Sequence, residues 1–178
     1  MTRTPITFFL DTLASPIGDL RLIIDADGVL RALDFEDYEE RMNRLLRRQY
    51  GEVVLVKGAA PDSIRAAIQR YFAGEFDALR EIPMRTGGTA FQRSVWEALT
   101  RIPPGETLSY GAMAAKIGAP AAVRAVGLAN GANPIALVAP CHRVIGANGS
   151  LTGFGGGLHR KRWLLQHEGA AFVDNGAI

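Results

Sequence analysis

The first part of the chain alternates apolar runs with short turn signals. Between Ile6 and Phe35, three apolar runs are separated by the segments Ser-Pro-Ile-Gly and Asp-Ala-Asp-Gly. Short apolar runs bounded by Gly, Pro, Asp and Ser are typical of strands joined by turns. The pattern therefore predicts an antiparallel meander over residues 6–35.

Helical spacing follows this meander. The charged segment DYEERMNRLLRRQYG is compatible with a helix that ends at Gly51, and EVVLV after it indicates another strand. The segment DSIRAAIQRYFAGE begins at Asp62, a plausible N-cap, and has four apolar residues at helical spacing: Ile64, Ala67, Ile68 and Tyr71. Because no chemical motif recurs here, we interpret residues 1–85 as an α+β scaffold domain.

The periodicity breaks at REIPMRTGGTA, and a mostly helical pattern begins. TAFQRSVWEALTRI has one apolar stripe, formed by Phe91, Val95, Trp96 and Leu99. In TLSYGAMAAKIGAP, Ser109 is placed to cap a short helix that ends at Gly118. In PAAVRAVGLANG, Pro120 suits the first turn of a helix and Gly131 its end. Two short helices joined by a tight turn predict a helix-turn-helix within a second domain, residues 86–178.

The second of these helices has few side chains that could recognise bases. Arg124 stands among Ala, Val and Gly, whereas a helix that reads the major groove normally offers several Arg, Asn, Gln or Lys side chains. The thin helix suits close approach to a groove, with Arg124 as a single inserted side chain. A packing helix with one surface arginine is the alternative.

Composition limits the class of protein. The 178 residues are 48% hydrophobic and 21% charged, enough for one ordinary core or two small ones. The single cysteine excludes an internal disulfide and suits a reducing cytoplasm. The N-terminal apolar stretch is too short and interrupted for a membrane span and lacks a cleavage site, so we expect a cytoplasmic protein. The net charge is −2 over residues 1–85 and +4 over the rest, which permits a polyanionic partner for the second half.

That cysteine lies in an unusual setting. In PIALVAPCHRVIG, Cys141 ends an apolar, strand-like run and precedes His142 and Arg143. An apolar run could bury a thiol as an inert small hydrophobe, but cationic neighbours stabilise a thiolate and lower the thiol pKa. A nucleophile needs a base, and the base needs an orienting group, for which both Glu168 and Asp174 are available. Adjacent side chains of a strand point to opposite faces, so the Cys-His pair requires a turn or a water link.

The segment PCHRVIG, the NP seven residues upstream, and GSLTGFGGGLHRKRWLLQHEG resemble the active-site region of the O6-alkylguanine-DNA alkyltransferases. The match is dense over roughly residues 87–169, and earlier residues share only looser features such as SPIGDLRL and YFAGE. The resemblance implies an α+β fold: an antiparallel-sheet, RNase H-like N-terminal domain followed by a winged helix-turn-helix-like catalytic domain. It also implies irreversible, single-turnover transfer of the alkyl group from O6-alkylguanine, and from O4-alkylthymine, in duplex DNA to Cys141.

The resemblance implies minor-groove binding, flipping of the damaged nucleotide and a role for each of five catalytic residues. These are Cys141 as alkyl acceptor, His142 as base through a bound water, Glu168 as the group that orients His142, Asn133 as the residue that holds the turns around the cysteine, and Tyr110 as proton donor to the departing guanine.

Further residues are assigned to binding by the same resemblance. The implied DNA contacts are Arg124, which fills the place of the flipped nucleotide, with Tyr110, Ala125, Gly127 and Asn130. The implied substrate contacts are Tyr110, Val144, Phe154, Gly155 and Gly156. Many relatives have Tyr at the position of Phe154, some have Ser at Gly155 and some have Pro at Ala136, so the range of accepted alkyl groups is left open.

The implied chemistry needs no cofactor and no metal. Some relatives hold zinc in the N-terminal domain, but this chain has no cysteine there and no histidine before His142. The expected partner is double-stranded DNA containing O6-alkylguanine, with no membrane involved. We expect a monomer in solution, and clustering on DNA is left open. The competing interpretations are a damage-binding protein that lacks the reactive cysteine, a Cys-His thiol hydrolase with turnover, and a winged-helix transcription regulator.

Overall fold

The chain forms two compact units, Met1–Gly88 and Thr89–Ile178. The computed structural model describes residues 4–154 and 156–173. Over these residues, no helix combines the length and the apolar character that crossing a membrane requires.

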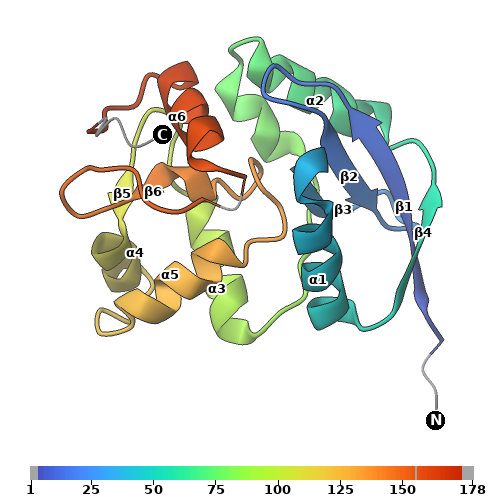
Figure 1. Ribbon diagram of the computed structural model, residues 1–178, viewed down its shortest axis with the longest axis horizontal. Coiled ribbons are helices and arrows are strands. Elements are labelled where there is room, and N and C mark those ends of the chain that lie inside the picture. The colour runs from blue at the N-terminus through green and yellow to red at the C-terminus, as the bar shows by residue number, and fades with distance from the viewer. Residues whose placement is uncertain (1–3, 155, 174–178) are drawn as a thin grey trace. The chain divides into compact units, whose positions relative to one another are not determined.

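The first unit is built on a four-stranded sheet with the order β3-β2-β1-β4 (Figure 1). Its strands are β1 (Ile6–Leu13), β2 (Leu20–Ile24), β3 (Leu30–Phe35) and β4 (Val53–Lys57). The first three pair antiparallel, which confirms the predicted meander. The fourth pairs parallel to β1, so the sheet is mixed rather than wholly antiparallel. The reason is the crossover helix α1 (Glu39–Tyr50), which returns the chain to the end of the sheet where β1 begins.

Helices cover both faces of this sheet. On one face, α1 packs its buried Met42 and Leu46 against strand residues Phe8, Ile23 and Ala32. Asp11 points to the opposite face from Phe8 because strand side chains alternate, and it accepts a hydrogen bond from Arg65 of α2 (Asp62–Phe72) at 2.8 Å. Asp62 is the first residue of α2 rather than its N-cap, a position held by Pro61. Two 3-10 helices complete the unit, η1 (Glu36–Tyr38) and η2 (Phe76–Glu81).

The second unit is mostly helical. Its elements in chain order are α3 (Ala90–Leu99), β5 (Leu108–Ser109), α4 (Tyr110–Lys116), α5 (Val123–Gly131), the 3-10 helix η3 (Cys141–Arg143), β6 (Val144–Ile145) and α6 (Leu158–His167). The predicted stripe of α3 is buried at Val95, Trp96 and Leu99. The Trp96 indole donates to the Ala129 carbonyl at 2.8 Å, which ties α3 to α5. The α+β fold class is thus confirmed.

Helices α4 and α5 form the helix-turn-helix that the sequence predicts. The Ser109 hydroxyl accepts from the Ala112 amide at 3.0 Å and caps α4, as expected. Gly118 has a φ of 78°, a left-handed conformation that reverses the chain after α4 without a steric penalty. Pro120 lies in the turn, ahead of the first residue of α5, so its predicted place in the first helical turn is wrong. Gly131 ends α5 as predicted.

Candidate functional site

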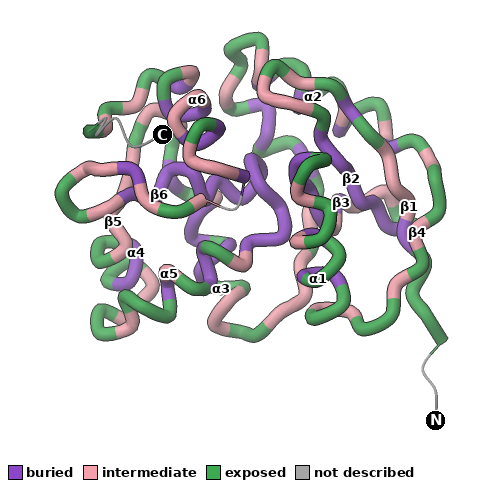
Figure 2. The backbone as a smooth tube through the Cα atoms, viewed as in Figure 1, coloured by how far each residue is buried: buried purple, intermediate pink, exposed green. Residues whose placement is uncertain are grey.

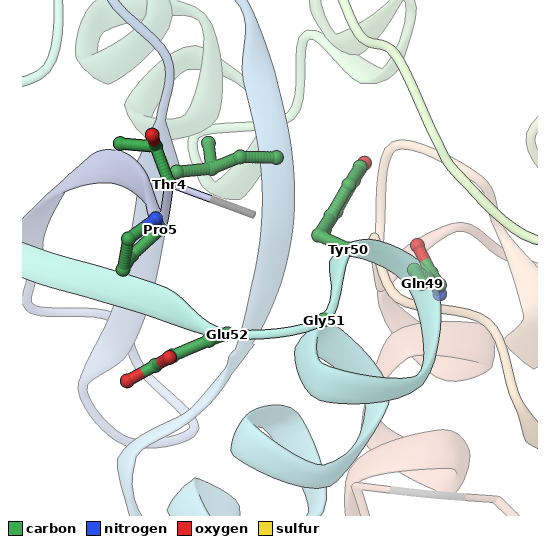
Figure 3. Close-up of a pocket in the computed structure, with 7 residues that line it drawn as sticks. Thr4, Pro5, Gln49, Tyr50, Gly51 and Glu52 are labelled. Carbon is green, nitrogen blue, oxygen red and sulfur yellow. The ribbon is translucent and has the colours of Figure 1, made fainter. Parts of the chain in front are cut away.

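The first unit has a surface pocket of about 410 Å³ between the end of α1 and the start of β1 (Figure 3). Its lining residues are Thr4, Pro5, Ile6, Gln49, Tyr50, Gly51 and Glu52. These residues include a carboxylate but no cation, histidine or cysteine. The groups with reactive chemistry lie instead in the second unit.

The segment around Cys141 is buried at every residue from 133 to 145 (Figure 2). Its apolar run, residues 135–139, forms turns instead of the expected strand. Leu137 has a φ of 70° and is the one non-glycine residue with positive φ in the described part of the chain. The Val138 amide donates to the Ala136 carbonyl at 2.9 Å across it, which closes a strained γ-turn. A similar bond of 2.8 Å joins the Cys141 amide to the Ala139 carbonyl around Pro140.

Asn133 stabilises these turns from inside. Its amide nitrogen donates to the Ala139 carbonyl at 2.7 Å, and its amide oxygen accepts from the Ile135 amide at 3.1 Å. Both partners are buried backbone groups that a strand would have paired with a neighbouring strand. Because an unpaired buried polar group costs about 1–3 kcal/mol, the asparagine allows the chain to turn here.

Asn130 takes a different place from the one expected. It is only 5% exposed, and its side chain donates to the Cys141 carbonyl at 3.4 Å. The residue points inward from α5 toward the reactive segment, because its helical position follows the buried Val126 by one turn. We therefore do not retain the expected DNA contact for Asn130.

Cys141 and His142 are adjacent in η3, which is a tight helical turn. A turn is one of the two arrangements that their adjacency in the sequence requires, the other being a water link. They are 5% and 0% exposed. Directly after η3, strand β6 pairs in parallel with β5, with Leu108 opposite Val144. Since Tyr110 follows β5 immediately, this short pairing places Tyr110 beside the segment that follows β6.

Glu168, one of the two expected partners, contacts His142, and the other, Asp174, lies outside the described residues. The His142 Nε2 and Glu168 Oε2 atoms are 2.8 Å apart, and both side chains are fully buried. Glu168 is placed by the end of α6, where Gly169 has a φ of 72° and the Ala170 amide donates to the Leu165 carbonyl at 2.9 Å. This is the glycine-terminated helix end that the sequence HEG favours.

Arg143 holds the other side of the Glu168 carboxylate. Its Nε donates to Oε1 at 2.8 Å, its Nη2 donates to Oε2 at 2.9 Å, and its Nη1 donates to the Ile102 carbonyl at 2.6 Å. Burial by itself raises the pKa of Glu168, but His142 and Arg143 outweigh it and hold that pKa well below its usual range. Glu168 is therefore ionised. Sequence reasoning had treated Arg143 only as a cationic neighbour of the cysteine.

The charge on Glu168 determines which nitrogen of His142 carries the proton. An ionised carboxylate only accepts hydrogen bonds, so Nε2 is the donor in this pair. Burial lowers the pKa of His142, and Glu168 opposes the shift only in part. The imidazole is then neutral with a lone pair on Nδ1, an atom without a hydrogen-bond partner among the described residues. His142 can accept a proton at Nδ1.

Tyr110 is the first residue of α4 and links the helix-turn-helix to the segment after β6. Its hydroxyl is 2.8 Å from the Thr152 hydroxyl. A Cβ placed on Gly127 of α5 would be 3.8 Å from the Tyr110 ring, so the ring lies beside that helix. Tyr110 is half-buried, and Thr152 is a contact that sequence reasoning did not identify.

The outer face of α5 is thin, apolar and carries a single cation. Arg124 and Ala125 are exposed, and Gly127 is half-exposed. Val123 is 40% and Leu128 is 70% exposed, an unusual position for large apolar side chains. Such a face suits a close approach to a surface that is itself partly apolar.

The expected substrate contacts differ in how far they are buried. Val144 is buried, and its carbonyl accepts from the Lys161 ammonium at 2.6 Å. Phe154 is half-buried, Gly156 is buried, and Gly155 lies outside the described residues. Sequence reasoning missed Lys161, although a signal was present: Lys161 precedes the buried Leu164 and Leu165 by three and four positions, the spacing of one helix face. Within the described ranges, no three His, Cys, Asp or Glu side chains are grouped as metal ligands.

Comparison with known proteins places this geometry in context. Residues 90–170 match the family model described as 6-O-methylguanine DNA methyltransferase, DNA binding domain. A methylated-DNA–protein-cysteine methyltransferase of Salmonella typhimurium is 47% identical over 161 residues, which cover 89% of this chain and 94% of that protein. The corresponding protein of Mycobacterium tuberculosis is 47% identical over 160 residues, 88% of this chain and 90% of that protein.

Solved structures agree with the sequence relatives. The crystal structure of Mycobacterium tuberculosis OGT in complex with DNA is 45% identical, superposes with a TM-score of 0.75, and covers 92% of this chain and 93% of that chain. The O6-methylguanine-DNA methyltransferase of Pyrococcus kodakaraensis, at 22% identity, a TM-score of 0.73, and coverage of 92% of this chain and 99% of that chain, shares the fold. The chain belongs to the family of methylated-DNA–protein-cysteine methyltransferases.

Proposed function

We propose that this protein repairs alkylated DNA by moving the alkyl group of O6-alkylguanine, and of O4-alkylthymine, from duplex DNA to its own Cys141. The observation that carries the proposal is the buried series of Cys141, His142, Glu168 and Arg143, in which Glu168 binds the imidazole of the residue that directly follows the cysteine. The relatives carry the same activity in their names, and one was crystallised with DNA.

The chemistry is a displacement at the alkyl carbon. A water molecule relays the thiol proton of Cys141 to Nδ1 of His142, and the sulfur forms a bond to the alkyl carbon as the bond from carbon to O6 breaks. The departing guanine takes a proton from the Tyr110 hydroxyl, which His142 restores through solvent. A soft thiolate suits this step. The product is a thioether that water does not cleave, so each molecule acts once.

The helix-turn-helix supplies the DNA contact in this proposal. The thin outer face of α5 enters the minor groove, with Ala125 and Gly127 close to the backbone and Arg124 in the space left by the flipped nucleotide. Tyr110 borders the flipped base, while Val144, Phe154, Gly155 and Gly156 border the guanine. Residues 86–178 thus bind DNA and react, and residues 1–85 serve as their scaffold.

Intact-protein mass spectrometry tests the reaction directly. After incubation with excess duplex containing one O6-methylguanine, we expect the mass to rise by a single methyl group, and peptide mapping should place it on Cys141. The reaction should stop at one equivalent because the thioether is stable. Unmodified protein that still binds the lesion would contradict the proposal, and repeated turnover would indicate a hydrolase instead. Duplex with unmodified guanine is the control.

The role of Arg124 predicts a difference between two substrates. Arg124→Ala should slow methyl transfer from duplex DNA about tenfold or more, since flipping costs a few kcal/mol and the arginine compensates part of that cost. Reaction with the free modified base needs no flipping and should be nearly unchanged. Arg93→Ala, which removes an exposed arginine of α3, is the control. An equal loss on both substrates would refute the role.

A further inference from the structure

The Tyr110 hydroxyl has a close partner in the segment after β6. Its oxygen lies 2.8 Å from the Thr152 Oγ1 atom, the usual separation of two hydrogen-bonded hydroxyl groups. Within the described part of the chain, this is the one hydrogen-bond partner of the Tyr110 hydroxyl. Both residues are half-buried, so the pair is partly shielded from water. The proposed reaction uses Tyr110 and gives Thr152 no role.

The backbone on both sides of this contact is held in place. Tyr110 directly follows β5, which pairs with β6 through Leu108 and Val144. On the other side, the Lys161 ammonium donates to the Thr152 carbonyl at 3.1 Å and to the Val144 carbonyl at 2.6 Å. Val144 thus connects the two segments, because its strand pairs with β5 and its carbonyl shares a donor with that of Thr152. The fold therefore sets the distance between the two hydroxyl groups.

Neither side chain has much freedom to move away from the other. A Cβ placed on Gly127 of α5 would lie 3.8 Å from the Cδ1 atom of Tyr110, so this helix confines one edge of the ring. Threonine is branched at Cβ, which restricts its χ1 angle to few rotamers. The Tyr110 oxygen is therefore fixed in position, and rotation of its O–H bond determines where the proton points.

The hydrogen-bonding capacity of the two hydroxyls decides what the contact can do. Each hydroxyl has one proton to donate and two lone pairs that accept. A Tyr110 hydroxyl that donated to Thr152 would have its only proton occupied. When Thr152 donates to Tyr110 instead, the phenolic proton is available to the departing guanine. The second arrangement suits the proton transfer that the proposed function assigns to Tyr110.

We propose that Thr152 is a positioning residue for Tyr110 in alkyl transfer, an inference that rests on the proposed function. The Thr152 hydroxyl donates to the Tyr110 oxygen and leaves the phenolic proton directed toward guanine. When that proton passes to guanine, the electron pair of the O–H bond stays on the Tyr110 oxygen. Thr152 keeps its own proton and stabilises this negative charge through a hydrogen bond that is already in place, until His142 returns a proton through solvent.

Two methyl donors separate this role from general damage to the site. Transfer from a duplex containing O6-methylguanine needs a proton for the departing guanine, whereas methyl iodide methylates Cys141 and releases iodide, which needs none. Thr152→Val removes the hydroxyl and keeps the branched shape, and Thr152→Ser keeps the hydroxyl. Thr100→Val is the matched control, because it removes a half-buried hydroxyl of the same unit that donates to the Glu97 carbonyl.

Single-turnover transfer from the duplex, with protein in saturating excess, should slow at least about tenfold in Thr152→Val, because part of the contribution of general-acid catalysis is lost. Methylation by methyl iodide, mapped to Cys141 by mass spectrometry, should keep the wild-type rate. Thr152→Ser should recover most of the duplex rate, and the control should react like the wild type with both donors. An unchanged duplex rate in Thr152→Val, an equal loss with both donors, or no recovery in Thr152→Ser would overturn the inference.

A double variant tests whether Thr152 acts through Tyr110. Tyr110→Phe removes the proposed proton donor, so adding Thr152→Val to it should slow duplex transfer by less than about twofold. A further loss as large as that in the wild-type background would show that Thr152 acts independently of Tyr110 and would overturn the inference. Wild-type protein that transfers no methyl group from the duplex would refute the proposed function itself. A reactive wild type with an unaffected Thr152→Val would refute the role of Thr152 alone.

Discussion

Cys141→Ser should abolish methyl transfer while the protein continues to bind duplex DNA. Serine preserves the approximate shape of a side chain in a position that is only 5% exposed, so we expect the turn around η3 to persist. A hydroxyl is not ionised near neutral pH and is a poor nucleophile toward an alkyl carbon, even beside His142. Transfer of labelled methyl from an O6-methylguanine duplex should fall below detection in a single-turnover assay.

The same samples show whether the loss is chemical. Affinity for the lesion duplex, measured by fluorescence anisotropy, should remain within about twofold of the wild type, because the outer face of α5 is unchanged. Circular dichroism should show the same helix content. Transfer at the wild-type rate, or a methyl group mapped to another residue, would remove Cys141 as the acceptor. A parallel loss of DNA affinity would point to a structural defect.

Glu168→Gln should weaken both stability and reaction. The glutamine leaves the Arg143 guanidinium buried without a carboxylate and cannot hold His142 through an ionised oxygen. Removing one partner of a buried ion pair typically costs about 3–5 kcal/mol, so chemical denaturation near neutral pH should show an unfolding free energy lower by that amount. Single-turnover transfer should slow at least about tenfold, because orientation of the base is lost.

The pH dependence follows from the direction of the Glu168 shift. The folded-state pKa of Glu168 is lowered, so its stabilising contribution is fully present above the unfolded value near 4.3 and is lost as the pH falls toward the folded value. The deficit of Glu168→Gln should therefore shrink when denaturation is repeated below about pH 4. Glu106→Gln, at an exposed position of the same unit, is the control and should unfold like the wild type. A wild-type midpoint and rate in Glu168→Gln would contradict the assigned role.

Much of this architecture follows from the sequence by itself, because local signals act over a few residues. The turn segments between the three runs of residues 6–35 define the meander, Ser109 caps α4 through its own side chain, and Gly51 and Gly131 lie at the ends of their helices. The motif around Cys141 and His142 resembles the family by its residues alone. These features depend on backbone preferences and short spacings.

The tertiary structure decided the features that depend on distant partners. Pairing of β4 parallel to β1 depends on the path of α1, and the turn at residues 135–139 depends on the side chain of Asn133. Sequence spacing left Glu168 and Asp174 as alternatives for the group that orients His142. Only the packing of α6 against η3 brings the Glu168 Oε2 atom to 2.8 Å from the His142 Nε2 atom. The burial of Lys161 likewise depends on the two distant carbonyls that its ammonium binds, those of Val144 and Thr152. The partners of a buried charge are groups that the fold brings together from distant parts of the chain, so a short stretch of sequence does not identify them.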